Sequence, residues 1–365
     1  MKIIQIIPNF EIAGAETMCE KLVYELVNLK CEVIVVSLYR TETEITEKLK
    51  RSGIKVIYLD KKSGFDFLQI LKLYKLFKEE KPDVVHTHLY SLKYAACASI
   101  MAKVPVSVHT IHNIAQKESD KPSRILNGLY FKSDKVTPVS LTEEIQVTMT
   151  DEYNINKEQT PVIYNGMPIE DYLPKGDYSV KDSIKILHVG RFSPQKNHKR
   201  LIEAFEIVCR KHPKAKLVLA GVGVLMEEIK LLVHKKGLQE NVEFLGLCTD
   251  VKALMNTADI FCLPSDYEGM PMTLIEAMAT ALPIVATNIG GVPDMIRDGV
   301  EGLLCESNPA SVADALINLI EDESLRKKMG QAALLKAQNY SSKNMAEKYL
   351  ELYASKMKKH RGASK

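Results

Sequence analysis

Short apolar runs alternate along the chain with longer amphipathic segments, and this alternation occurs twice. In the first half, the runs typical of buried strands are Ile3 to Pro8, Glu32 to Leu38, Val56 to Leu59, Val84 to Thr87 and Val106 to His109. The segments with helical spacing between them are Glu16 to Leu29, Phe67 to Glu80 and Leu92 to Ala102. Near-continuous apolar strands that alternate with helices predict a parallel sheet covered on both faces.

The same order of elements begins again near residue 184. The strands expected there are Ile184 to Val189, Lys216 to Ala220, Val242 to Leu245, Ile260 to Leu263 and Pro283 to Ala286. The helices expected between or after them are Lys199 to Lys211, Leu225 to Gly237, Thr249 to Thr257, Met272 to Ala279 and Pro309 to Glu321. The pattern therefore predicts an α/β protein with two doubly wound domains in tandem.

Turn-forming and polar residues mark the seam between the two predicted domains. Asn165-Gly166-Met167-Pro168 favours a turn, and Pro174 to Ser179 is mostly polar. We therefore expect a first domain at residues 1–165, a linker at 166–182, a second domain at 183–340 and a C-terminal segment at 341–365. Because ligands of open parallel sheets lie outside the carboxyl ends of the strands, we expect the substrate cleft between the domains.

Composition supports this picture and narrows the choice of partners. The 365 residues are 46% hydrophobic and 26% charged, which is enough to bury two cores. Residues 341–365 hold 7 Lys+Arg against 2 Asp+Glu, whereas the whole chain carries only +3, so the body is balanced. Such a balance argues against a nucleic-acid partner. The basic tail Lys356 to Arg361 and the amphipathic segment Lys117 to Lys135 are candidate contacts with anionic lipid, and ordinary helix packing is the alternative for both.

Cysteine spacing and hydropathy indicate the compartment. Seven cysteines lie far apart with no C-x-x-C pair, which argues against a disulfide framework or a thiolate zinc site. The apolar run Ile3 to Pro8 is too short for a signal peptide, and no stretch reaches the roughly 18 apolar residues of a membrane span. We expect a cytoplasmic protein, with any membrane contact peripheral and at the inner face.

The most informative segment runs from Ser265 to Met278. An expected strand ends just before it, a glycine-containing loop follows, and Pro271 suits the first turn of a helix. The free amides of Met272 and Thr273, together with the helix dipole, predict an anion site. Glu268 and Glu276 flank that site. Two carboxylates beside an anion favour a ligand rich in hydroxyl groups, such as a sugar and a ribose, and the alternative is ordinary loop and helix positions.

A second positive element begins where the strand at Ile184 to Val189 ends. Gly190 and Arg191 follow that strand, and Lys196 comes five residues after the arginine. Arginine binds phosphate oxygens through two nitrogens, and lysine acts as a point charge, so the pair and the helix start could hold a diphosphate without a metal. Gly221 and Gly223 follow the next strand, where they either contact the ligand or relieve crowding.

Together these motifs resemble those of the family 4 retaining glycosyltransferases, which have the GT-B fold. The motifs are Gly14-Ala15-Glu16, Asn165-Gly166, Gly190-Arg191 with Lys196, Ala220-Gly221-Val222-Gly223, Glu268 with Glu276, Gly290-Gly291-Val292-Pro293, and Asp298-Gly299 with Gly302. The resemblance covers nearly the whole chain. It implies two Rossmann-like domains facing across a cleft, a last helix that crosses back to the first domain, and transfer of a sugar from a nucleotide-sugar to an acceptor.

The resemblance also implies a role for each matched residue of the second domain. Arg191 and Lys196 would hold the donor diphosphate, and Glu276 would bind the ribose hydroxyls. Glu268, with the backbone amides of Gly269-Met270, would orient the transferred sugar. No separate nucleophile is visible, and no cofactor is expected beyond the nucleotide-sugar itself.

In the first domain, the resemblance implies that Gly14 lets the backbone approach the donor phosphate and that His112 touches the sugar near its anomeric carbon. Ala13 stands where the family often has a further glycine. His86-Thr87-His88 and His109-Thr110-Ile111-His112 end two strands, so four imidazoles could gather at one rim. A metal site is the alternative, but no Asp or Glu lies within the two motifs, and we expect no metal. A structural role is favoured for His86, and the role of His88 stays open.

These inferences combine into one expected activity. We expect a hexosyl unit to move, with retention, from a nucleoside-diphosphate sugar, UDP being preferred, to a saccharide or polyprenyl-linked saccharide acceptor in surface-polysaccharide synthesis. The alternatives are a nucleotide-sugar epimerase of the same fold and a non-catalytic nucleotide-sugar-binding partner. A nicotinamide-dependent oxidoreductase is disfavoured, because Pro8-Asn9-Phe10 follows the first strand in place of a G-x-G-x-x-G turn.

Overall fold

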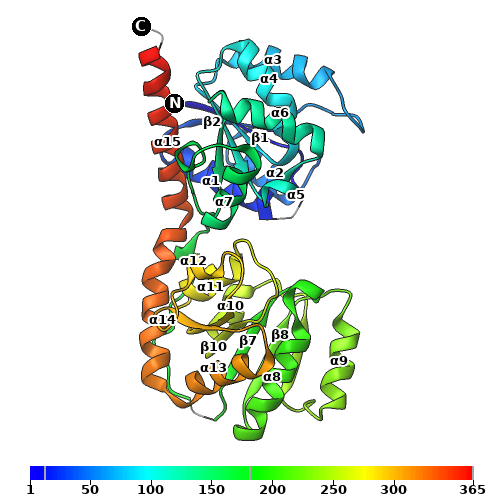
Figure 1. Cartoon of the computed structure of the whole chain (residues 1–365), viewed down its shortest axis with the longest axis vertical. Helices are drawn as coiled ribbons and strands as arrows, with labels where there is room; N and C mark the ends of the chain where they lie inside the picture. Colours follow the sequence, from blue (N-terminus) through cyan, green and yellow to red (C-terminus); the bar gives the residue numbers. More distant parts are fainter. Residues whose placement is uncertain (12–13, 181, 364–365) are drawn as a thin grey trace. The chain divides into compact units, whose positions relative to one another are not determined.

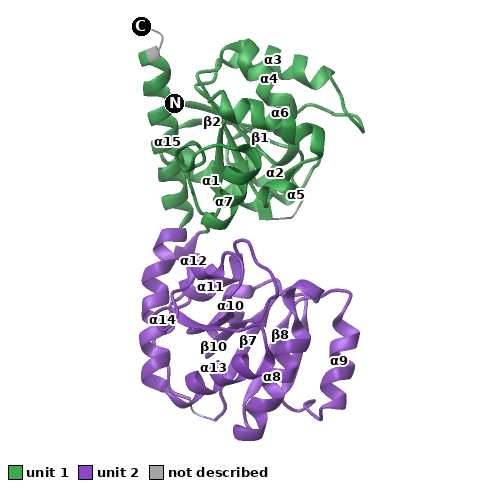
Figure 2. Ribbon diagram, viewed as in Figure 1, with its two compact units in different colours: residues 1–167, 341–365 green, residues 168–340 purple. Residues whose placement is uncertain are grey.

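The chain forms two compact α/β units, shown in Figures 1 and 2. The computed structural model describes residues 1–11, 14–180 and 182–363. Unit 1 comprises Met1–Met167 and Ser341–Lys365, and unit 2 comprises Pro168–Tyr340. The described residues of each unit contain a six-stranded sheet whose strands pair in parallel, so the expected α/β class with two doubly wound sheets is confirmed.

Unit 1 has the sheet order β3-β2-β1-β4-β5-β6. Its strands are β1 Lys2–Ile7, β2 Glu32–Ser37, β3 Lys55–Tyr58, β4 Val84–His88, β5 Val106–Ile111 and β6 Thr137–Ser140. Its α-helices are α1 Gly14–Asn28, α2 Glu44–Arg51, α3 Leu68–Glu80, α4 Leu92–Ala102, α5 Ala115–Glu118, α6 Lys121–Lys132, α7 Glu143–Tyr153 and α15 Ser342–Ala363, with 3-10 turns at η1 Leu89–Ser91 and η2 Lys157–Gln159.

Alternate residues of the strands build the two cores of unit 1. Ile3 of β1 belongs to a core with α1 and α15, whereas its neighbour Ile4 belongs to a core with α3 and α4. Tyr349 and Tyr353 of α15 are fully buried in the first of these cores. The C-terminal helix is therefore part of unit 1, and its tyrosines reach the sheet below it.

Unit 2 has the sheet order β12-β11-β10-β7-β8-β9. Its strands are β7 Lys185–Val189, β8 Lys216–Ala220, β9 Val242–Gly246, β10 Ile260–Leu263, β11 Ile284–Thr287 and β12 Gly302–Cys305. Its helices are α8 His198–Lys211, α9 Met226–Lys235, α10 Val251–Asn256, α11 Met272–Ala279, α12 Val292–Met295, α13 Pro309–Glu321 and α14 Glu323–Ala337, with 3-10 turns η3 Ile169–Asp171, η4 Pro194–Lys196 and η5 Gln338–Tyr340. Helices α8, α9 and α13 pack on alternate residues of its strands.

The segment expected as a linker is divided between the units, because the seam falls after Met167. Lys175 bonds the carbonyl of Thr280 through its amide (2.9 Å) and the carboxylate of Asp259 through its ammonium (3.0 Å). Tyr178 donates to the carbonyl of Ala281 at 2.8 Å. These contacts fasten residues 168–180 to unit 2.

The seven cysteines are free thiols. Within the described ranges, no helix has both the length and the apolar character needed to cross a bilayer.

Candidate functional site

The start of α11 in unit 2 is built as expected from its sequence. Strand β10 ends at Leu263, a loop follows, and α11 begins at Met272 after Pro271, whose backbone is extended. No side chain caps this helix end. The hydroxyl of Thr273 is buried and lacks a hydrogen-bond partner within the described structure. This helix end suits an anion, because its amides are uncapped, its dipole is favourable and the Thr273 hydroxyl is free to donate.

Lys196 and Glu268 meet beside this helix start. The Lys196 ammonium lies 2.5 Å from Oε1 of Glu268, and the hydroxyl of Ser265 donates to the same oxygen at 2.6 Å. The Glu268 side chain is only 6% exposed and that of Lys196 is 17% exposed. Lys196 stands at the end of the short turn η4, directly before α8. The two side chains are 72 residues apart in sequence and form one largely buried ion pair.

The carbonyl of Glu268 is held from the other side by the Gly290-Gly291 turn. The amide of Gly291 donates to this carbonyl at 2.9 Å. Gly290 has φ of 51°, and a Cβ there would stand 2.1 Å from the same oxygen. Only glycine fits so close a backbone approach with a left-handed φ. The motif at 290–293 therefore fixes the main chain that carries Glu268.

Arg200 is a supporting residue that the sequence reading missed. It is 9% exposed, and its guanidinium donates to the carbonyl of Pro264 (2.8 Å) and to the carboxylate of Asp266 (2.6 Å). Asn197 caps α8 and donates to the other oxygen of Asp266 at 2.9 Å. The loop between β10 and α11 is thus tied to the start of α8 by charged hydrogen bonds.

The glycines after β7 and β8 are required by a backbone crossing. A Cβ on Gly221, whose φ is 140°, would stand 2.0 Å from the carbonyl of Gly190, and one on Gly223 would stand 2.4 Å from the carbonyl of Phe192. The amide of Phe192 donates to the carbonyl of Val222 at 3.1 Å. This crossing gives Gly221 and Gly223 a structural reason to be glycine, and it sets the loop that bears Arg191, whose side chain is exposed.

Glu276 lies one turn inside α11 and is partly buried. The hydroxyl of Tyr172 donates to its Oε1 at 3.1 Å. Burial, with the nearby Glu276 carboxylate, raises the pKa of Tyr172, so the phenol stays protonated as the donor. Tyr172 is a second residue that the sequence reading missed, since it falls in the expected linker. Gly269 and Met270, the other expected donor contacts, are partly exposed between these two glutamates in the chain.

In unit 1 the four histidines gather at the carboxyl ends of β4 and β5, as their positions predicted. His86 bonds Thr110 Oγ1 through Nε2 (2.7 Å) and the hydroxyl of Tyr353 through Nδ1 (2.7 Å). The two ring nitrogens of His86 therefore link β4 to β5 and to α15. His88 bonds Gln5 Oε1 through Nε2 (2.9 Å) and His112 Nε2 through Nδ1 (3.2 Å).

These contacts fix the protons on the rings. An amide oxygen only accepts, so His88 donates to Gln5 through Nε2 and accepts from His112 Nε2 at its Nδ1. Burial lowers the pKa of His109 to about 3 and that of His112 to about 4, so both rings are neutral near pH 7. Among the residues that the structure describes, no group of three or more His, Cys, Asp or Glu side chains could hold a metal ion.

One buried acid lies beside the histidines, just outside the two motifs. Glu118 accepts from the backbone amide of His112 at 3.1 Å, and its Oε1 lies 3.9 Å from His109 Nε2. Its side chain is 3% exposed, and burial raises its pKa to about 8. Glu118 follows the second histidine motif by six residues, and this short separation is the one feature of the sequence that could have indicated a carboxyl beside the histidines.

Gly14 begins α1 at the same edge of the sheet. Within the described structure, nothing lies within 4 Å of the place where its Cβ would stand, so packing does not require glycine there. Glu16 is buried two residues later, and burial raises its pKa. Ala13 lies outside the described residues.

Comparison with known sequences covers both units. Residues 12–171 match the family described as Glycosyltransferase Family 4, and residues 175–336 match Glycosyl transferases group 1. The chain is 31% identical over 280 residues to an Escherichia coli UDP-Gal:alpha-D-GlcNAc-diphosphoundecaprenol alpha-1,3-galactosyltransferase, covering 71% of this chain and 72% of that protein. It is 27% identical over 303 residues to the Bacillus anthracis N-acetyl-alpha-D-glucosaminyl L-malate synthase, covering 79% of each.

Solved structures share the fold. A Rickettsia africae glycosyltransferase matches with a TM-score of 0.84 and 20% identity over 98% of both chains. Anabaena HepE in complex with UDP matches with a TM-score of 0.83 and 21% identity over 97% of this chain and 100% of that one. The two-domain GT-B architecture expected from the motifs is thereby confirmed.

Proposed function

The chain belongs to glycosyltransferase family 4 and is a glycosyltransferase, and from this premise we propose that it moves a hexosyl unit from a UDP-sugar to a saccharide or lipid-linked saccharide acceptor with retention of configuration. The observation that carries the proposal is the Lys196–Glu268 ion pair beside the uncapped start of α11. A cation and a hydrogen-bond acceptor next to a free helix start suit a sugar attached to a diphosphate, which supports this proposal.

Unit 2 supplies the groups for the donor. Arg191 and Lys196 offer positive charge for the diphosphate, with the amides of Met272 and Thr273. Glu276, oriented by Tyr172, offers a carboxylate to the ribose hydroxyls. The solved HepE structure is a complex with UDP, and the E. coli relative is named for UDP-Gal, which together support uridine as the base.

The chemistry follows from where charge develops. As the bond between the anomeric carbon and the diphosphate breaks, negative charge grows on the departing oxygen and positive charge on the sugar ring. Lys196 and the helix amides stabilise the first, a contribution of about 3 kcal/mol for each well-placed donor. The Glu268 carboxylate, which accepts a hydrogen bond from Ser265, stands on the side of the sugar. The acceptor hydroxyl attacks the same face and gives its proton to the departing phosphate oxygen, so no protein nucleophile is needed.

We assign the acceptor to unit 1. Its carboxyl edge carries His112 and the start of α1, and ligands of parallel sheets lie at this edge. The neutral His112 ring accepts at Nδ1, because its Nε2 donates to His88. A hydroxyl group of the sugar or of the acceptor is the partner that such an acceptor nitrogen fits. The name of the E. coli relative, which acts on a diphosphoundecaprenol-linked sugar, supports a lipid-linked saccharide as the acceptor.

The test is donor turnover by the purified chain. UDP-, GDP- and ADP-sugars are incubated with and without a bacterial lipid extract, and the nucleoside diphosphate released is measured. We expect release from one UDP-sugar, raised severalfold by the extract, with the anomeric configuration of the product matching that of the donor by NMR. Saturable donor binding with no release under any condition would favour a non-catalytic binding partner, and a new sugar formed without an acceptor would favour an epimerase.

A further inference from the structure

Unit 1 contains a cavity of about 690 Å³ whose lining includes none of the residues assigned to the donor or to the histidine cluster. Residues that follow β2, β3 and β4 line it, namely Tyr39, Lys61 and Tyr90, together with Lys93 of α4 and Leu126 and Tyr130 of α6. We call this cavity the Lys61 pocket. It opens at the carboxyl edge of the sheet, and its volume lies within the roughly 300–1,000 Å³ typical of small-ligand sites.

Lys61 brings a buried positive charge to this pocket. The residue is 7% exposed, and its ammonium donates to the hydroxyl of Tyr39 (2.9 Å) and to the carbonyls of Lys62 (2.7 Å) and Gly64 (2.6 Å). All three partners are neutral oxygens. Burial lowers the pKa of Lys61, but the bond to Tyr39 and the neighbouring tyrosines outweigh it, so the net pKa is raised and the charge is kept. A buried charge normally has an ionic partner, and within the described residues Lys61 has none.

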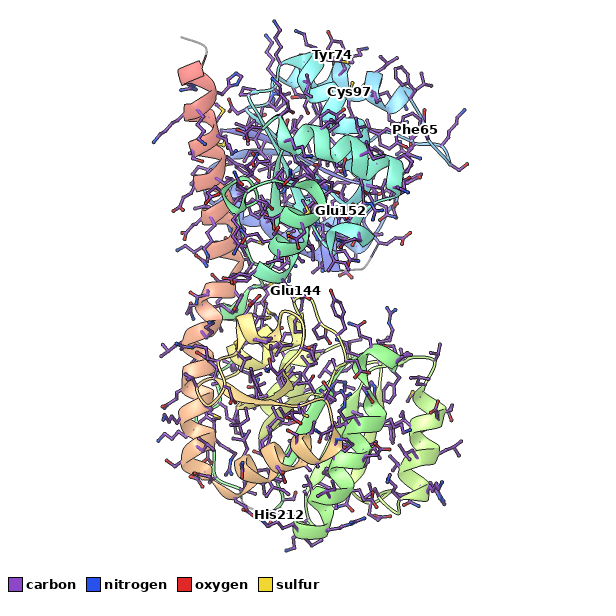
Figure 3. The ribbon with its side chains drawn as sticks, viewed as in Figure 1. Phe65, Tyr74, Cys97, Glu144, Glu152 and His212 are labelled. Carbon is purple, nitrogen blue, oxygen red and sulfur yellow. The ribbon has the colours of Figure 1, made fainter. Side chains whose placement is uncertain are left out.

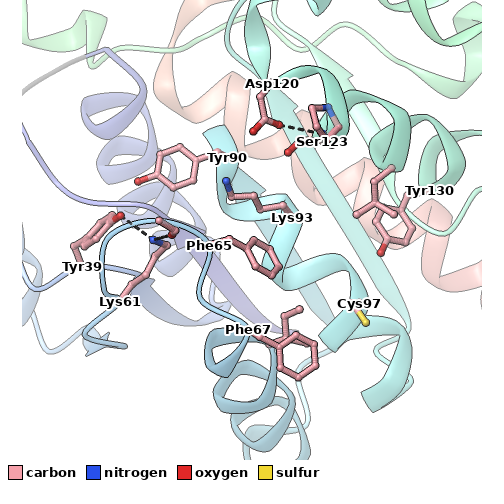
Figure 4. A pocket seen from close by; sticks show the side chains of 14 residues that line it. Tyr39, Lys61, Phe65, Phe67, Tyr90, Lys93, Cys97, Asp120, Ser123 and Tyr130 are labelled. Atoms are coloured by element: carbon pink, nitrogen blue, oxygen red, sulfur yellow. Dashed lines mark hydrogen bonds between the residues drawn. The ribbon is translucent and has the colours of Figure 1, made fainter.

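Lys93 adds a second ammonium. It lies 5.2 Å from the ring centre of Tyr90 and 5.5 Å from that of Tyr94, and the described structure gives it no ion pair either. In Figure 4 the side chains of Lys93 and Phe65 lie between Lys61 and Tyr39 on one side and Tyr130 on the other. Two cations held by aromatic rings therefore face one cavity.

The only carboxylate among the described residues that line the pocket is already engaged. Asp120 accepts from the backbone amide of Ser123 at 3.0 Å and so caps α6. The hydrogen bond to the Ser123 side chain and this one to its amide lower the pKa of Asp120. The positive charge of Lys93 lowers it as well, so the carboxylate stays charged in the pocket. Two lysines against this one carboxylate still leave the lining with a net positive charge.

Large apolar side chains surround the mouth of the pocket. Phe65 is 66% exposed and Phe67 is 60% exposed, both on the loop before α3, and Leu126 of α6 is 36% exposed. Figure 3 shows Phe65 on this loop, and Cys97, which also lines the pocket, on the neighbouring part of unit 1. So much exposed aromatic surface at a cavity mouth marks a binding site for an apolar group.

We propose that the Lys61 pocket binds the diphosphate and the first isoprene units of a polyprenyl-diphosphate-linked acceptor, with the phosphates against Lys61 and Lys93 and the hydrocarbon chain along Phe65 and Phe67. This inference rests on the proposed function, since it specifies the acceptor of that reaction. Charge complementarity selects the occupant. Asp120 balances at most one of the two lysines, so a saccharide alone or an uncharged lipid would leave the pocket with an uncompensated positive charge.

The test measures binding of a short analogue, farnesyl diphosphate, by isothermal titration calorimetry. The titration is run with the full chain in excess UDP, so that the anion site at α11 is filled. We expect saturable binding that is at least about tenfold weaker for Lys93→Met, as the loss of a charged contact predicts. The double variant Phe65→Ser/Phe67→Ser should weaken it as well, and because both phenylalanines are exposed the fold should survive.

Matched controls separate the pocket from general charge and apolar effects. Lys62→Met removes an exposed lysine next to the pocket, and Leu231→Ser removes a leucine of unit 2 that is 72% exposed. Both should bind farnesyl diphosphate like the parent. Equal affinity of the parent for inorganic diphosphate or for farnesol would overturn the proposal, and so would parent-like affinity in Lys93→Met.

The same titration distinguishes the two proposals. UDP binding tests the donor site of unit 2, and farnesyl diphosphate binding tests the pocket of unit 1. UDP binding and turnover on a soluble saccharide, without farnesyl diphosphate binding, would refute the pocket and keep the transferase. Farnesyl diphosphate binding without any UDP binding would refute the assigned donor site and keep the pocket.

Discussion

The ammonium of Lys196 lies 2.5 Å from the carboxylate of Glu268, in a pair whose members are 17% and 6% exposed. The two residues come from different loops, one after β7 and one after β10. Each therefore holds the other in place before any ligand arrives. Removing either partner of such a pair is destabilising, because the remaining charge is left buried without a counter-charge.

This pairing predicts non-additive effects on catalysis. Lys196→Met and Glu268→Gln should each lower kcat by about 10²- to 10³-fold, the usual effect of losing one preorganised charged contact. The double variant should lose far less than the product of the two, since each single change already breaks the shared contact. Steady-state kinetics on the parent, the two single variants and the double variant gives the coupling free energy between Lys196 and Glu268. Lys199→Met, an exposed lysine three residues after Lys196, is the control and should keep the parent rate. Independent, multiplicative losses would show that the pair does not act as a unit.

The hydrogen bond between Tyr172 and Glu276 predicts that both residues determine donor affinity. Glu276→Ala should raise the KM for the donor sharply, and Tyr172→Phe should raise it by about tenfold, because it removes a hydrogen bond to a charged group. Both should change kcat little. Tyr58→Phe is a matched control, since the hydroxyl of Tyr58 also bonds a carboxylate, that of Glu42 at 3.2 Å, but in unit 1. A donor KM equal to that of the parent in Glu276→Ala would remove this glutamate from the site.

Chelation should leave the activity unchanged. Arg191, Lys196 and the helix amides supply the positive charge that a divalent ion would otherwise bring to a diphosphate. In unit 1, both ring nitrogens of His86 and of His88 already have protein partners. Donor turnover in a roughly tenfold molar excess of EDTA over the protein should equal that without it. Loss of turnover that Zn²⁺ restores would favour a metal at the histidine cluster, and loss that Mg²⁺ restores would favour a metal at the donor diphosphate.

Glu118 predicts how stability depends on pH. Its pKa is about 8 in the folded chain, above its ordinary 4.5, because it is buried. Between these values the folded chain holds a proton that the unfolded chain has lost, so stability falls as pH rises through this window, by at most about 1.4 kcal/mol per pH unit. Glu118→Gln removes this dependence. Urea unfolding of both proteins at pH 5, 6, 7 and 8 should show the variant gaining on the parent as pH rises. A constant difference would mean that the carboxyl is ionised throughout.

The neighbouring histidines do not obscure that comparison. Burial lowers the pKa values of His109 and His112, so their neutral forms are favoured on folding and their effect on stability is confined to pH values below about 7. The same histidines are present in both proteins, and the difference between parent and variant isolates Glu118.

Much of the fold could be predicted from periodicity, because most strands are buried on both faces. The strands that periodicity missed, β6 and β12, lie at the edges of their sheets. β6 contains Pro138, which cannot donate to a ladder and argues against a strand, yet an edge strand tolerates it. β12 begins with Gly302, packed against Ile284 of β11 so closely that a Cβ would stand 2.5 Å from its carbonyl. Local sequence records neither an edge position nor such an approach.

Some residues of the candidate site could likewise be predicted from local sequence, and others could not. Lys196, Glu268 and the start of α11 stand in motifs with a local chemical pattern, and the structure brings them together. Tyr172 and Glu118 have no such pattern, because their roles arise only from tertiary contacts with Glu276 and His112. Long-range partners of this kind cannot be deduced from the spacing of residues along a single chain.

Gly290 ties the turn after β11 to the backbone of Glu268. An alanine there would place its Cβ 2.1 Å from the carbonyl of Glu268, at a φ of 51°. Gly290→Ala should therefore displace Glu268, weaken UDP-sugar binding at least about tenfold and lower stability by about 1–3 kcal/mol. Gly237→Ala is the matched control, since Gly237 also has a positive φ, 67°, but no described atom lies within 4 Å of its Cβ position. Gly237→Ala should lower the free energy of unfolding by only about 1–2 kcal/mol, the cost of a left-handed backbone at alanine, and should keep the donor affinity of the parent. Calorimetric titration and thermal unfolding of both variants decide the matter: parent-like donor affinity in Gly290→Ala would mean that the turn does not position Glu268.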